Sequence, residues 1–338
     1  MQELILPKVI FGTSGLGNLY VALPDEVKLS IVKESIKHSP KPVVFDSAGK
    51  YGAGLALEAL GSSLEQLLIS PSDVLISNKL GWLRTALKTT EPTFEPGIWK
   101  NLEHDAIQHI SYDGILECYE QGNKLLGNYN AQLVSVHDPD EYLAASKDEQ
   151  EQKQRYQDIL DAYRALHELK AADRVRAIGV GAKDWRVIAR IVKDVKLDWV
   201  MIANSMTIHS HPAALVDFML ELEQQGITVI NSSVFNGGFL TGSAYYNYQL
   251  TDPEKDKKLY HWRQQFYQLC QDYKIKPVAA CAVFGMNAPG VRSIALNTTQ
   301  AERVAQNVAL PHSIIPEGFW KEMEKRGLID QSYAASYL

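Results

Sequence analysis

Short apolar runs recur along the whole chain, and each is rich in valine or isoleucine. They lack the alternation of apolar and polar positions that marks a strand with one face in water. Runs of this kind are typical of parallel strands that are buried on both faces. They occupy residues 9–11, 43–45, 74–76, 133–136, 177–180, 199–203, 227–230 and 291–296.

Helical patterns lie between these runs. One apolar stripe repeats at helical spacing and ends at Gly226, just before the next run; it consists of Leu215, Phe218, Met219 and Leu222. A strand followed by a helix, repeated about eight times, predicts a parallel sheet. Eight such units in a chain of 338 residues have the size of a (β/α)8 barrel. A doubly wound open sheet is the alternative fold.

Some segments depart from this alternation. Residues 80–110 are too long for a simple connection, and we interpret them as a long substrate loop. After the last strand, residues 300–308 and 316–326 have helical patterns, and we expect these helices to lie over the barrel. The tail, residues 327–338, is expected to fold over the barrel mouth or to be mobile. No change of composition marks a linker, so we predict one domain over residues 1–338.

Composition and charge narrow the choice of partner. The chain is 46% apolar and 22% charged, which is ordinary for a globular protein, and its formal net charge is −6. A mildly acidic chain offers no electrostatic attraction to nucleic acid or to an anionic membrane. The most apolar long stretch, residues 278–286, is too short to span a bilayer. We therefore expect a small-molecule partner and no nucleic acid or membrane partner, and the oligomeric state stays open.

The three cysteines point to a reducing compartment. Cys118, Cys270 and Cys281 have neither the number for a disulfide framework nor the spacing of a zinc site, so no metal is predicted. The segment from Met1 to Leu4 contains an acid and no basic residue, unlike a signal peptide. These features predict a cytoplasmic protein.

Candidate chemistry appears where three of the predicted strands end. Asp46 follows the second run, Lys79 follows the third and His137 follows the fourth, while Tyr51 lies five residues beyond Asp46. In a barrel of this kind the functional side chains lie at the carboxyl ends of the strands. We therefore expect these four side chains to converge at one mouth.

The four residue types suit proton transfer at a carbonyl or alcohol oxygen. A tyrosine has an ordinary pKa of about 10, and a neighbouring ammonium lowers it. A carboxylate keeps that lysine charged, and a histidine can orient the substrate oxygen. The set supplies no hydride, so a cofactor must supply or accept it.

Each residue taken alone also has a purely structural explanation. Asp46 could cap a helix, and Tyr51 could be a packed aromatic side chain. Lys79 could be a solvated loop residue, and His137 could be a buried histidine with satisfied hydrogen bonds. A different barrel enzyme could use Lys79 for a Schiff base, although that chemistry needs a neutral lysine and Asp46 would keep it charged.

Three segments together resemble the aldo-keto reductase family. They are FDSAGKYGAGLALEALGSSL, VLISNKLG and VSVHDPD, and their order and spacing agree with that family over nearly the whole chain. The segments HDPD, GVGAKDW and SVFNGGFLTG resemble the branch of that family that contains sugar 1-dehydrogenases of the D-threo-aldose (L-fucose) type and pyridoxal 4-dehydrogenase. The resemblance implies that Tyr51 is the general acid or base, that Lys79 lowers its pKa, that Asp46 holds Lys79, and that His137 orients the carbonyl.

The same resemblance implies a nicotinamide dinucleotide across the barrel mouth. The segment GTSGLG does not have the spacing of a Rossmann fingerprint, so the phosphates are expected near the loops after the last two strands. Positions 297–299, where many relatives carry a lysine or arginine for the 2′-phosphate of NADP, are polar and uncharged here, which favours NAD over NADP. The implied cofactor residues are Gly12, Thr13, Ser14, Ser233, Val234, Phe235, Asn236, Gly237, Gly238, Leu240, Asn297, Thr298, Thr299, Arg303 and Asn307.

The implied substrate pocket includes Leu19, Tyr20 and Trp82, with Trp99 and Tyr333 as further candidates. Aromatic walls with a few polar groups suit a sugar or pyridine ring. The predicted reaction is oxidation of an aldose such as L-fucose at C1 to its lactone. Two alternatives stay open: NADPH-dependent reduction of small aldehydes, and a cofactor-sensing barrel subunit without catalysis.

Overall fold

Eight parallel strands close into a barrel in the computed structural model, which describes residues 4–338. The predicted barrel is confirmed, and the open sheet is excluded because β1 pairs with both β2 and β12. In barrel order the strands are β1 (Val9–Gly12), β12 (Val291–Leu296), β9 (Thr228–Ser232), β8 (Trp199–Ala203), β7 (Ala177–Ala182), β6 (Leu133–His137), β3 (Val74–Leu80) and β2 (Val43–Ala48).

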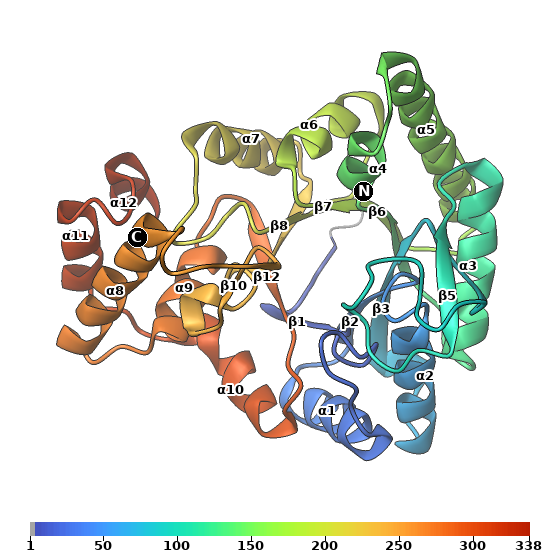
Figure 1. Ribbon diagram of the computed structural model, residues 1–338, viewed down its shortest axis with the longest axis horizontal. Coiled ribbons are helices and arrows are strands. Elements are labelled where there is room, and N and C mark those ends of the chain that lie inside the picture. Colours follow the sequence, from blue (N-terminus) through green and yellow to red (C-terminus); the bar gives the residue numbers. More distant parts are fainter. Residues whose placement is uncertain (1–3) are drawn as a thin grey trace.

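Helices surround the strands on the outside of the barrel, as Figure 1 shows. Short 3₁₀ turns occupy Pro71–Asp73, Phe239–Thr241, Ala301–Arg303 and Leu310–His312. The α-helices are α1 (Asp25–His38), α2 (Leu55–Gln66), α3 (Tyr112–Leu126), α4 (Pro139–Ala144), α5 (Glu149–Ala171), α6 (Trp185–Asp194), α7 (Ala213–Gln224), α8 (Lys257–Asp272), α9 (Pro277–Met286), α10 (Val304–Ala309), α11 (Glu317–Lys325) and α12 (Gln331–Tyr337).

A layer of apolar side chains closes the amino end of the barrel. Trp199 is fully buried in this layer, and Leu4 and Leu6 pack against it. A Cβ atom on Gly179 would lie 2.2 Å from Cδ2 of Trp199, so the neighbouring strand needs glycine to make room for the indole. The amino end of the barrel is therefore filled by packed side chains, and a ligand can bind only at the carboxyl ends of the strands.

The 80–110 loop contains a hairpin that the sequence pattern did not indicate. Strands β4 (Trp82–Ala86) and β5 (His104–Gln108) pair antiparallel with each other and lie outside the barrel sheet. A second short hairpin, β10 (Tyr245–Tyr246) with β11 (Gln249–Leu250), follows β9. Both hairpins connect barrel units at the carboxyl side, and they shape the mouth.

The C-terminal helices pack beside α8 and α9 instead of folding over the mouth. Tyr333 is 3% exposed and contacts the rings of Phe284 and His211. The backbone N–H of Asp330 donates to Nε2 of His211 at 3.0 Å. Figure 1 shows α11 and α12 beside α8, on the far side of the molecule from α2 and α3. Tyr333 fills an aromatic cluster with His211 and Phe284, beside α8 and α9. The predictions that the tail covers the mouth and that Tyr333 lines the pocket are therefore wrong.

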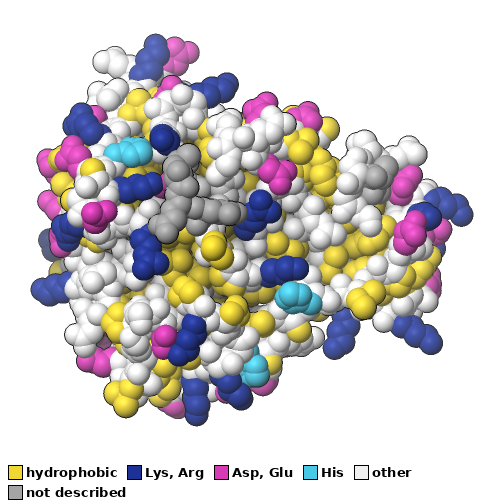
Figure 2. Space-filling model, turned by 180° about the vertical axis from the view of Figure 1, so that it is seen from behind, with side chains coloured by type: hydrophobic (Ala, Val, Ile, Leu, Met, Phe, Trp, Pro, Cys, Tyr) yellow, Lys and Arg dark blue, Asp and Glu magenta, His cyan; other side chains and the backbone are white. Residues whose placement is uncertain are grey.

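Apolar and charged side chains are mixed on the face seen from behind in Figure 2, where lysine, arginine and acidic side chains are scattered among hydrophobic ones. Across residues 4–338, no helix combines the length and the apolar character that a membrane span requires.

Candidate active site

The four candidate catalytic residues meet at the carboxyl ends of three adjacent strands. Strand β3 pairs with β2 on one side and with β6 on the other, which brings Asp46, Lys79 and His137 together. Nζ of Lys79 lies 2.5 Å from Oδ2 of Asp46 and 4.8 Å from the ring centroid of Tyr51. The rings of Tyr51 and His137 meet edge to face with centroids 5.6 Å apart. The convergence expected from strand order is present.

The turn that carries Tyr51 is fixed by close backbone packing. Gly52 has a φ of +61°, and a Cβ atom there would lie 2.3 Å from the carbonyl oxygen of Gly17. Only glycine fits this left-handed position against the loop after β1. Thr13 joins the same loop to β2, because its Oγ1 donates to the carbonyl oxygen of Asp46 at 3.1 Å. These contacts position Tyr51 from both sides.

Burial dominates the protonation of Tyr51 and His137. Burial raises the pKa of Tyr51 well above its ordinary value, and the charge of Asp46 adds to that effect, while Lys50 acts to lower it. Burial therefore outweighs the lowering of the Tyr51 pKa by the neighbouring ammonium of Lys50. Burial, followed by Lys79 and Lys50, lowers the pKa of His137 well below its ordinary value. His137 is thus a neutral imidazole at neutral pH.

An aromatic cluster lies next to Tyr51. It contains Phe94 and Trp99 of the 80–110 loop, and Leu19, Tyr51 and Trp82 pack against it. The ring centroids of Trp99 and Tyr51 are 5.9 Å apart. The structure therefore brings two of the three predicted substrate residues, Leu19 and Trp82, to the same cluster as Tyr51. The third, Tyr20, is half-exposed and stacks on Tyr245 of the second hairpin, with centroids 5.2 Å apart.

Two polar residues near this site were not predicted. Lys50 is buried beside Tyr51, and its ammonium contacts carboxylates of Glu95, Asp138 and Glu141. Asn204 follows β8 directly, and its buried Oδ1 has no hydrogen-bond partner among residues 4–338. Reading the residue after each apolar run would have found Asn204. Lys50 gave no such signal, because it lies inside a turn.

The predicted cofactor residues lie along one continuous arc, since β9, β12 and β1 are neighbours in the barrel. Nδ2 of Asn297 donates to Oγ of Ser14 at 3.0 Å, which joins the loops after β12 and β1. Arg303 is exposed on the 3₁₀ turn after β12, and Thr298 accepts a hydrogen bond from the N–H of Gln300. A hollow of about 10 Å³ is lined by Gly12, Thr13, Asn297, Thr298 and Asn307, among others.

The segment 233–240 after β9 offers a cofactor at the mouth its backbone more than its side chains. Val234, Asn236 and Leu240 are fully buried, so their side chains are not available to a cofactor at the surface. Nδ2 of Asn236 is used internally, donating to the carbonyl oxygen of Asn204 at 3.1 Å. Phe235 is partly buried, Gly237 and Gly238 have positive φ, and Oγ of Ser233 hydrogen-bonds to the hydroxyl of Tyr248.

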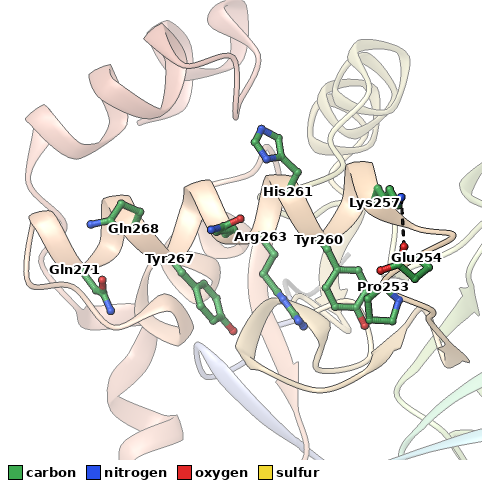
Figure 3. Close-up of a pocket in the computed structure, with 10 residues that line it drawn as sticks. Pro253, Glu254, Lys257, Tyr260, His261, Arg263, Tyr267, Gln268 and Gln271 are labelled. Atoms are coloured by element: carbon green, nitrogen blue, oxygen red, sulfur yellow. Dashed lines mark ion pairs between the residues drawn. The ribbon is translucent and has the colours of Figure 1, made fainter.

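Arg263 of α8 holds this segment from outside. Its Nη1 donates to the carbonyl oxygens of Phe239 and Ser243 at 3.1 and 2.9 Å. Figure 3 shows Arg263 between Tyr260 and Tyr267 along an open groove of about 620 Å³. Figure 1 places α8 on the other side of the molecule from α2 and α3, so this groove is separate from the catalytic side of the mouth.

Comparison with known proteins agrees with this geometry. Residues 8–326 match the aldo/keto reductase family. Pyridoxal 4-dehydrogenase from Microbacterium luteolum is 24% identical over 326 residues, covering 94% of this chain and 93% of that protein. D-threo-aldose 1-dehydrogenase from a Pseudomonas species is 25% identical over 346 residues, covering 96% and 95%.

Solved structures share the fold at low identity. A glycerol dehydrogenase from Gluconobacter oxydans superposes with a TM-score of 0.67 at 15% identity, covering 98% of this chain and 92% of that chain. An aldo-keto reductase from Bacillus halodurans has the same TM-score at 16% identity, covering 96% and 92%. The chain belongs to the aldo/keto reductase family and is an NAD(P)-dependent oxidoreductase acting on small molecules.

Proposed function

We propose that this enzyme oxidises an aldose, such as L-fucose, at C1 to its lactone, with Asp46, Tyr51, Lys79 and His137 as catalytic residues. The observation that carries the proposal is the convergence of the four side chains, in which the Asp46–Lys79 pair lies beside the Tyr51 ring. An ammonium placed there stabilises the phenolate, which is the form of tyrosine that accepts a proton.

Each residue has a defined task in this proposal. Tyr51 takes the proton from the C1 hydroxyl in its phenolate form and becomes a neutral phenol, and Lys79 stabilises that phenolate before the transfer. Asp46 keeps Lys79 charged and in place. His137 is neutral, so its imidazole N–H donates to the substrate oxygen without competing for the proton.

A nicotinamide dinucleotide, when bound, accepts the hydride from C1. The residues present fit such a group. The unpartnered Oδ1 of Asn204 is an acceptor suited to the amide N–H of a nicotinamide. Ser14 and Asn297 offer polar groups at the neighbouring strand ends, and the turn at Gly237 offers backbone N–H groups. Asn297, Thr298 and Thr299 are uncharged, which supports NAD over NADP.

The surroundings of Tyr51 support an uncharged ring as substrate. Trp99 supplies an aromatic face, and polar groups of Lys50 and its carboxylate partners lie close by. Sugars and pyridine aldehydes both combine a flat or apolar face with hydrogen-bonding groups. The two curated relatives are named for substrates of these two kinds, and the aldose is the one proposed here.

The test follows absorbance of the reduced nicotinamide with NAD⁺ and NADP⁺ separately, against L-fucose, D-arabinose, other aldoses and pyridoxal. We expect turnover of aldoses that is faster with NAD⁺. Tyr51→Phe should lower turnover by about 100-fold or more, because it removes the acid or base. Its cofactor affinity, measured by quenching of protein fluorescence, should stay nearly unchanged.

Two results would contradict the proposal. Unchanged turnover in Tyr51→Phe would remove Tyr51 from the mechanism. Silence with every aldose, together with reduction of small aldehydes by NADPH, would replace the aldose with an aldehyde as substrate.

A further inference from the structure

Lys50 is a buried lysine whose charge the catalytic scheme does not use. Its side chain is 4% exposed, and it immediately precedes Tyr51. Its Nζ lies 2.8 Å from Oε1 of Glu95, 3.1 Å from Oδ2 of Asp138 and 3.0 Å from Oε2 of Glu141. We refer to these four residues as the Lys50 junction. A lysine ammonium has three N–H donors, so the junction provides one carboxylate for each.

The partners come from separate parts of the chain. Glu95 belongs to the 80–110 loop, and Asp138 and Glu141 belong to the turn after β6 and to α4. Asp138 directly follows His137, and its Oδ2 is 3.5 Å from Nε2 of that histidine. One ammonium therefore joins the segment that carries Tyr51, the segment that carries His137 and the 80–110 loop.

The charge balance keeps Lys50 ionised. Burial acts to lower its pKa, but the attraction of Asp138, Glu95 and Glu141 outweighs burial, and the pKa is raised. Removing one member of such a buried pair leaves the remaining charges without compensation, which is strongly unfavourable. Glu141 also contacts Lys183, so the junction continues toward the end of β7.

Glu95 connects the Lys50 junction to the aromatic cluster. Its Oε2 accepts a hydrogen bond from Nε1 of Trp99 at 2.6 Å, and the Trp99 ring lies against Tyr51. On its other side the loop is held by backbone hydrogen bonds, in which the N–H of Tyr20 donates to the carbonyl oxygen of Ile98. Lys50 and these backbone hydrogen bonds therefore hold the loop at separate residues, Glu95 and Ile98.

We propose that Lys50 is a positioning residue that holds the 80–110 loop closed through Glu95, so that Trp99 forms the wall of the substrate pocket beside Tyr51. The substrate-binding part rests on the proposed function. The loop-closing part rests only on the contacts of the junction.

The first measurement is hydrogen exchange on the whole chain without substrate or cofactor. Glu95→Gln removes the charge that pairs with Lys50 but keeps an amide oxygen that can accept from Nε1 of Trp99, and it leaves Lys50 with two carboxylates. Loss of a charge-assisted hydrogen bond should speed exchange at residues 94–98 by about 10-fold or more. Glu91→Gln is the matched control, because Glu91 is exposed on the same loop. Lys50→Met should have the same effect as Glu95→Gln, or a larger one.

The second measurement separates binding from chemistry. In Glu95→Gln we expect KM for the aldose to rise by about 10-fold or more, with kcat within about 3-fold, because the change loosens the substrate wall and leaves the reacting groups in place. Cofactor affinity should not change.

Exchange and KM that match the Glu91→Gln control would overturn the proposal. Faster exchange with an unchanged KM would overturn the role of Trp99 as a substrate wall. If no aldose were turned over at all, the proposed function would fail, while the exchange result would still decide whether Lys50 closes the loop.

Discussion

Two buried lysines lie close to Tyr51, and their surroundings differ. Lys79 is on a barrel strand and has one carboxylate partner, Asp46, on the neighbouring strand. Lys50 is in a turn and has three carboxylate partners from loops and a short helix. The first pair is fixed by strand register, which cannot shift without opening the barrel. The second depends on segments that can move, so it suits adjustment of the pocket and the first suits chemistry.

The strongest way to test this contrast is Lys79→Met. We expect turnover to fall by about 100-fold or more, with little change in KM, because the neighbouring charge acts on the phenol during proton transfer. The limb of the pH–rate profile that reports Tyr51 should move to higher pH, since loss of an ammonium raises the pKa of the phenol. A limb that stays in place would show that Lys79 does not tune Tyr51.

The charge of the substrate tests the electrostatic character of the barrel mouth. Three lysines at the mouth are already paired: Lys79 with Asp46, Lys50 with three carboxylates and Lys183 with Glu141. D-arabinose should therefore be oxidised with a kcat/KM about 10-fold or more above that of its 5-phosphate, because a phosphate placed there meets the carboxylates of Glu95, Asp138 and Glu141 beside lysines that are already paired. Glu141→Gln, which releases a donor on both lysines, should narrow the difference. Faster oxidation of the phosphate ester by the wild-type enzyme would contradict this account of the mouth.

The smallest expected effect is on stability. Burial and both lysines lower the pKa of His137 in the folded protein, so the unfolded chain binds a proton more readily. The contribution of His137 is then complete above pH 6.5 and is lost as the pH falls toward the lowered pKa, by up to about 1.4 kcal/mol for each pH unit. Urea unfolding at pH 7.5 and 5 should show a shallower pH dependence for His137→Gln than for wild type. Equal slopes would mean that His137 is not held neutral.

The features that the sequence predicted correctly are the barrel strands and the side chains at their carboxyl ends. Valine- and isoleucine-rich runs located all the barrel strands, and the residues after three of them brought Asp46, Lys79 and His137 together. Those inferences succeed because a buried parallel strand has a strong local pattern and its end has a known place in a barrel.

Contacts between distant loops were not predictable in the same way. Lys50 lies 88 and 91 residues from Asp138 and Glu141, and no local pattern connects them. Strands β4 and β5 are short and mostly half-exposed, so neither an apolar run nor a clear alternation marks them. The roles of Tyr333 and of the buried side chains after β9 depended on which face of a loop packs inward, and composition does not determine that.

The pairing of β4 with β5 has a consequence for how such an enzyme changes its substrate. The hairpin closes on itself and shares no hydrogen-bonded edge with the barrel sheet. The residues between its strands, which include Phe94, Glu95 and Trp99, contact the rest of the protein through Lys50 and through backbone hydrogen bonds to the loop after β1. Replacing the tip between Ala86 and His104 would leave the barrel pairing as it is, provided that the new tip keeps a carboxylate facing Lys50 and the backbone hydrogen bonds to residues 18–20.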